Sequence, residues 1–81
     1  MEIEEVKEKA KEIAEKVIFT DNLYETTEGI IAELKEIREE VFREKLKLIG
    51  VDSFEEHRME NLERYLDGMI EVFTDIKIYS E

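Results

Sequence analysis

Proline is absent from this 81-residue chain, and only three glycines interrupt it. Because these two residues most often end helices and form turns, long uninterrupted elements are expected. Apolar residues recur at spacings of three and four through most of the sequence, which at about 100° per residue places them on one helical face. The sequence therefore predicts an all-α fold, a small three-helix bundle forming a single domain over residues 1–81.

Three segments carry this helical periodicity. The first covers residues 2–18 and the second runs from about residue 27 to residue 49, with Gly50 following as a C-terminal cap. The third begins at "SFEE", residues 53–56, a capping-box pattern in which the Ser53 hydroxyl accepts a hydrogen bond from the first turn of the helix. The wide apolar stripe of the second segment predicts a central helix that contacts two neighbours or a second subunit.

Two regions of the sequence also fit β-structure. Residues 17–27 place a turn-forming Thr-Asp-Asn between residues that favour strands, and residues 69–79 follow Gly68 with alternating β-branched side chains. The alternative fold is therefore α+β, with a small sheet built from residues 17–27 and 69–79.

Charge limits the partners of this chain. With 23 acids against 12 lysines and arginines, the net charge is -11, which opposes binding to nucleic acid or to anionic membranes. A charged partner should therefore be basic. No stretch approaches the roughly 18 apolar residues of a membrane span, and the acidic N-terminus does not resemble a signal peptide, so we expect a cytoplasmic protein. The lack of Cys and Gln and the abundance of Glu and Lys are typical of heat-adapted proteins.

A row of acids runs along the third segment, with neighbouring acids three or four residues apart. On a helical wheel these acids lie opposite the apolar residues, which predicts a solvated face. If that face has a function, it is the candidate binding surface for a basic partner. The row consists of Glu60, Glu63, Asp67, Glu71 and Asp75.

Short chains bury a modest fraction of their surface, and with no Cys this one has no disulfide to add stability. Oligomerisation would supply the missing burial, and we expect a homo-oligomer, most simply a twofold dimer. The candidate interface consists of Ile31, Phe42, Leu46, Ile49, Tyr65, Met69 and Phe73. The leading hypothesis is a non-enzymatic acidic protein–protein interaction module. The alternative is an inhibitor that mimics nucleic acid and binds a basic DNA- or RNA-binding protein.

Nothing in the sequence predicts a catalytic, cofactor or metal site. His57 is the single histidine and lacks partners with metal-ligand spacing, while Ser53 is explained by its capping role. The paired acids in "EIREE" (36–40) and "ERYLD" (63–67) are similar to those of all-helical nucleotide pyrophosphatases of the MazG type, a resemblance that implies magnesium binding. The second pair departs from the family's spacing, and neither pair faces the predicted core. A metal-dependent enzyme similar to these nucleotide pyrophosphatases is therefore the third hypothesis.

Overall fold

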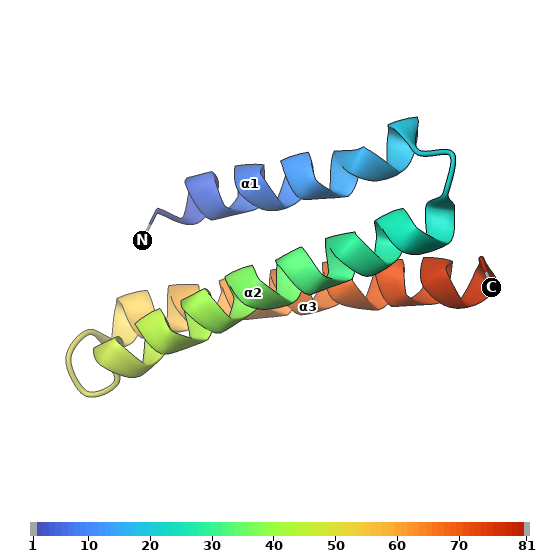
Figure 1. The fold of residues 1–81 in the computed structure, drawn as a ribbon. Helices are drawn as coiled ribbons and strands as arrows, with labels where there is room; N and C mark the ends of the chain where they lie inside the picture. Colours follow the sequence, from blue (N-terminus) through green and yellow to red (C-terminus); the bar gives the residue numbers. More distant parts are fainter. Residues whose placement is uncertain (1, 81) are drawn as a thin grey trace.

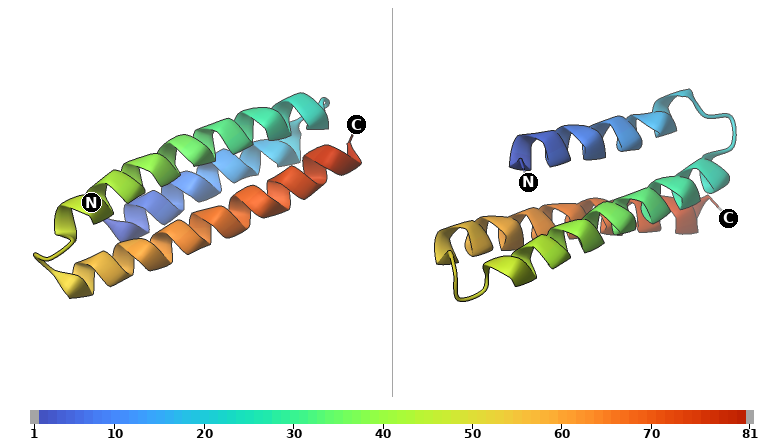
Figure 2. Two further views of the ribbon diagram at one scale, coloured as in Figure 1. Left: turned by 90° about the horizontal axis from the view of Figure 1, so that it is seen from below. Right: turned by 60° about the vertical axis from the view of Figure 1, so that its left-hand side comes forward.

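The computed structural model describes residues 2–80 and contains three helices: α1 (Ile3–Glu15), α2 (Leu23–Leu48) and α3 (Ser53–Tyr79). A short 3₁₀ helix, Lys16–Phe19, continues α1. Helices α2 and α3 form an antiparallel hairpin, and α1 lies along one side of it (Figures 1 and 2). The predicted all-α bundle is confirmed. The α+β alternative is wrong, because residues 2–80 contain no strand.

Capping side chains set where the two long helices begin. Helix α2 starts ahead of its predicted position because the Asn22 side chain accepts a hydrogen bond of 3.1 Å from the Glu25 backbone N–H. The predicted Ser53 cap is wrong by one residue. The Asp52 carboxylate instead accepts from the Glu55 N–H at 3.1 Å, and Ser53 is the first residue of α3. Both caps satisfy backbone donors that have no partner within the helix.

A tight turn joins the two long helices. Ile49 has φ -61° and ψ 122° and Gly50 has φ +76°, the backbone angles of a type II turn. The Val51 N–H donates to the Leu48 carbonyl at 2.9 Å and closes this turn. Gly50 therefore ends α2 as predicted, because the positive φ that it adopts is unfavourable for residues with a side chain.

The core is built mainly between α2 and α3. Ile30, Leu34, Leu62 and Leu66 are each at most 2% exposed. Helix α1 contributes only Ala10 and Ile13 to the buried cluster. The hairpin therefore forms most of the core, and α1 covers one side of it.

The molecule is long and thin. Its radius of gyration is 14.0 Å and its extents are 46 × 20 × 14 Å, whereas a compact chain of this length has a radius of gyration of about 12 Å. Its accessible surface is 5625 Å², against about 5100 Å² expected for a monomer of this mass. The fold thus leaves more surface open than a compact domain would. Among the described residues, no helix has the length and apolar character needed to cross a bilayer.

Candidate functional site

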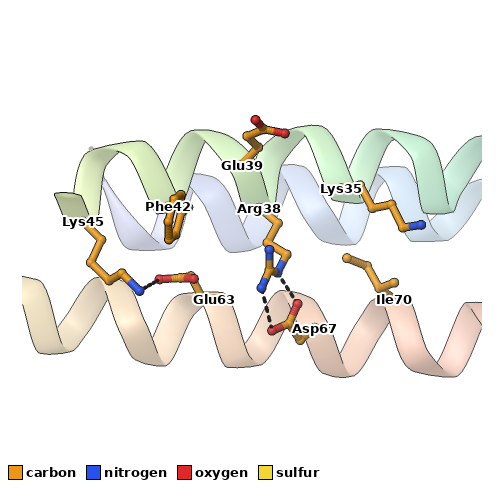
Figure 3. Close-up of a pocket in the computed structure, with 8 residues that line it drawn as sticks. All are labelled: Lys35, Arg38, Glu39, Phe42, Lys45, Glu63, Asp67 and Ile70. Atoms are coloured by element: carbon orange, nitrogen blue, oxygen red, sulfur yellow. Dashed lines mark hydrogen bonds and ion pairs between the residues drawn. The ribbon is translucent and has the colours of Figure 1, made fainter.

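A groove lies between α2 and α3, and no residue of α1 lines it. Its volume is about 760 Å³, and Figure 3 shows the side chains that line it. Most of the residues that line the groove are three or four positions apart on their helix. This spacing places them on the same side of that helix, facing the groove. The lining residues are Lys35, Arg38, Glu39, Phe42 and Lys45 from α2, and Glu63, Asp67 and Ile70 from α3.

A buried ion pair crosses this groove. Lys45 Nζ lies 2.7 Å from Glu63 Oε1, and the side chains are 20% and 9% exposed. The approach lacks hydrogen-bond geometry, so Glu63 Oε1 is buried without a hydrogen-bond donor. The Glu63 carboxylate therefore depends on the charge of Lys45, in surroundings where little water screens the two groups.

A second ion pair lies beside the first. Arg38 Nε donates to Asp67 Oδ1, and Arg38 Nη2 donates to Asp67 Oδ2 at 3.4 Å, so that the guanidinium approaches the carboxylate with two nitrogens (Figure 3). The hydrogen bond from Arg38 to Asp67, together with the negative charge of Asp67, raises the pKa of the Arg38 guanidinium. Arg38 therefore stays protonated at every pH at which carboxylates are charged. Both side chains are about half exposed, so this pair is better hydrated than Lys45–Glu63.

The structure divides the predicted row of acids. The expectation that all five point away from the core is wrong for Glu63, which is 7% exposed, and Asp67 turns towards α2 to pair with Arg38. Glu60 Oε1 lies 3.3 Å from Arg64 Nη2 on the outer side of α3, and Glu71 and Asp75 are exposed.

The buried side of α3 is rotated about the helix axis from its predicted position opposite the row of acids. At 100° per residue the rotation is roughly 60°. Tyr65, Met69 and Ile76 lie opposite the row of acids on the helical wheel, but they are only half-buried because α1 covers α3 thinly. Helix α2 instead draws in Met59, which is 1% exposed, and the neighbouring Glu63.

The seven residues of the candidate interface have different environments. Ile31 and Phe73 are 9% and 8% exposed in the core of the single chain, so they offer a partner little surface. Tyr65 and Met69 are half-buried on the side of α3 that faces α1. The remaining three, Phe42, Leu46 and Ile49, are 40–53% exposed and follow one another along the outer side of α2.

The candidate interface omitted several exposed apolar side chains, because helical periodicity alone does not show which apolar residues a neighbouring helix covers. Exposed fractions of 56% or more occur for Ile18, Phe19, Val51, Phe54, Val72, Ile78 and Tyr79. Sequence reasoning also missed the cations of the groove, since nothing in the local pattern marks Arg38 or Lys45 as the partners of acids on another helix.

Neither His57 nor the acids gather into a metal centre. The His57 side chain is 71% exposed, and its Nδ1 lies 4.0 Å from Glu60 Oε2. Residues 2–80 contain no group of three or more His, Cys, Asp or Glu side chains that could hold a metal ion. Comparisons with protein-family models, with curated proteins and with solved structures found no match to this chain.

Proposed function

We propose that this chain is a non-enzymatic interaction module that associates with a second copy of itself, most simply as a twofold dimer. One observation supports the proposal above all others. Among the described residues, the eleven buried apolar residues of the core are matched by eleven large apolar residues that are exposed. Exposed apolar side chains that lie next to one another mark interaction sites, and Phe42, Leu46 and Ile49 are spaced four and three residues apart.

The free energy available from this surface is large for so small a protein. Fully burying one leucine, isoleucine or phenylalanine side chain contributes about 1.5–3 kcal/mol, while a whole domain of ordinary size is stable by only about 5–15 kcal/mol. Covering three or four of the exposed side chains would therefore add a substantial part of the total stability. The elongated shape of the chain supports the same conclusion, because a second copy would widen a bundle that is thin by itself.

Charge opposes association and makes the proposal testable. Two chains that each carry a net charge of -11 repel each other, and this repulsion is screened within a Debye length of about 10 Å at 0.1 M salt. The dimer should therefore strengthen as salt is added. Association with a basic partner through the acidic surfaces would show the opposite trend, since salt weakens attraction between opposite charges.

Sedimentation equilibrium at micromolar concentration, repeated at low and high salt, tests the proposal directly. We expect a species of twice the chain mass whose dissociation constant falls as the salt concentration rises. Circular dichroism on the same samples establishes whether the chain is folded. A fully helical chain that stays monomeric at every salt concentration overturns the proposal.

A further inference from the structure

The groove between α2 and α3 is electrically balanced, although the chain as a whole is strongly acidic. Three cations and three acids line it together with Phe42 and Ile70, so its net charge is zero while the whole chain carries -11. A second copy of the chain therefore meets less repulsion at this face than the net charge of the whole chain would produce. Charge thus permits association through this groove.

The outer edge of α2 beside the groove has the residue spacing of a helix–helix seam. Ala32, Lys35, Glu39, Phe42, Leu46 and Ile49 are all exposed and follow one another at intervals of three and four. This alternation is the heptad pattern by which one helix packs against another, yet within residues 2–80 no other helix covers this edge. The first half of the edge is small and charged, and the second half is large and apolar.

From this pattern we infer that a second copy docks on the groove face, with the two α2 helices antiparallel around a twofold axis midway between Lys35 and Glu39. The inference rests on the proposed self-association and assigns it a surface. In this arrangement Lys35 of each chain meets Glu39 of the other. Lys35 has no ion-pair partner within residues 2–80, so the second copy supplies the carboxylate that its own chain does not.

The same axis also sets the levels at which the apolar residues of the edge lie, and it places Leu46 at the level of Glu28 of the other chain. Phe42 lies five residues beyond the midpoint at residue 37, and Ala32 lies five residues before it, so a large side chain meets a small one. Leu48, the last residue of α2, lies eleven residues beyond the midpoint, about 17 Å at 1.5 Å per residue, and Ile49 follows it in the turn. Tyr24 lies thirteen residues before the midpoint, and the Lys77 ammonium sits 5.4 Å from the Tyr24 ring centroid, which brings the neighbouring exposed Ile78 to that level. Ile49 of one chain thus meets Ile78 of the other.

The first test replaces an apolar residue of this edge by an acid. Phe42→Glu should weaken dimerisation by about a hundredfold or more, because it removes an apolar contact and buries charge in both copies. Val72→Glu is the matched control, since Val72 is 56% exposed but follows Tyr65 and Met69 along the side of α3 that faces α1. The control should retain the dissociation constant of the unsubstituted chain.

The second test exchanges the two charges. Lys35→Glu and Glu39→Lys should each weaken the homodimer by about tenfold, because each places like charges together at two symmetric positions. Mixing the two variants should restore affinity as a heterodimer, in which both contacts again join opposite charges. Both positions are exposed in the single chain, so folding should be preserved.

The outcomes separate this inference from the proposed function. A dimer that survives Phe42→Glu and dissociates with Val72→Glu overturns the assigned face and leaves self-association standing. Failure of the mixed charge variants to recover affinity overturns the assigned axis. An unsubstituted chain that is monomeric at every salt concentration overturns the proposed function itself.

Discussion

Helix α1 and the α2–α3 hairpin share one core but are held in it unequally. The hairpin supplies nine of the eleven buried apolar residues and carries two ion pairs between its helices, whereas α1 supplies Ala10 and Ile13. The 3₁₀ helix that continues α1 contacts α2 through the exposed pair Lys16–Glu33. The hairpin thus exceeds α1 both in buried apolar residues and in ion pairs between helices, and we expect α1 to be the less stable part.

Because α1 has fewer buried contacts than the hairpin, we expect α1 to detach locally before the hairpin unfolds. Regions with few buried contacts open at a lower free energy than the core, and α1 is the part of the chain that fits this description. Detachment of α1 would expose one side of the hairpin without separating α2 from α3. Stability measured at α1 and stability measured at the hairpin should therefore differ.

The largest effect is expected from truncating the centre of the hairpin. Leu66→Ala should lower the free energy of unfolding by about 3 kcal/mol, because Leu66 is fully buried and the packed helices can fill the cavity only in part. Ile13→Ala on α1 should cost about half as much, since α1 can shift towards the hairpin. Urea denaturation at one fixed protein concentration gives both values. Equal losses at the two sites would contradict the comparison.

The next largest effect concerns the buried ion pair of the hairpin. Lys45→Met leaves the Glu63 carboxylate without a partner where only 9% of its side chain is exposed, and should cost roughly 2 kcal/mol, because a buried acceptor loses its compensation. The double variant Lys45→Met with Glu63→Leu should recover most of this loss, because no unpaired charge then remains buried. A double variant as unstable as the single one would show that the pair itself, and not the isolated carboxylate, determines the stability.

The sequence was sufficient for the helices but not for their first residues. A chain without proline and with apolar residues three and four apart has few stable forms other than a helical bundle, and the structure agrees. The cap of α3 was misplaced because "DSFE" at 52–55 and "SFEE" at 53–56 both place a capping residue three positions before a glutamate. The start of α2 was misplaced because Asn22 was assigned to a possible hairpin turn rather than to a helix cap.

The groove could not be derived in the same way. A helical wheel describes one helix and weights its apolar residues equally, whereas burial depends on how closely each neighbour approaches. Glu63 is buried because α2 lies against it, and its contact with Lys45 depends on the hairpin register, which is set by contacts between helices. The exposed Phe42 has the same local pattern as core residues and is distinguished from them only by what covers it.

The turn that joins the hairpin offers a smaller and more selective perturbation. Gly50→Ala should destabilise the protein by about 1 kcal/mol, because alanine resists the positive φ that Gly50 adopts. Gly68→Ala within α3 should stabilise it by about 0.5–1 kcal/mol, since an added Cβ meets no atom within 4 Å and alanine favours helix. Thermal unfolding distinguishes the two by the sign of the change in Tm. The same sign for both substitutions would contradict the assigned backbone conformation of the turn.

The smallest effect is expected where α1 meets α2. Lys16 Nζ lies 2.8 Å from Glu33 Oε1, nearly the same separation as in the Lys45–Glu63 pair, but here the side chains are 53% and 44% exposed. Water already solvates both charges, so Lys16→Met should cost no more than about 0.5 kcal/mol, and the loss should shrink further at high salt. Urea denaturation of this variant and of Lys45→Met, each at low and high salt, compares two similar contacts that differ in burial. Lys16→Met could instead lower the free energy of unfolding as much as Lys45→Met does, with as little dependence on salt. That result would mean that α1 is held as firmly as the two helices of the hairpin, and it would contradict the difference between them.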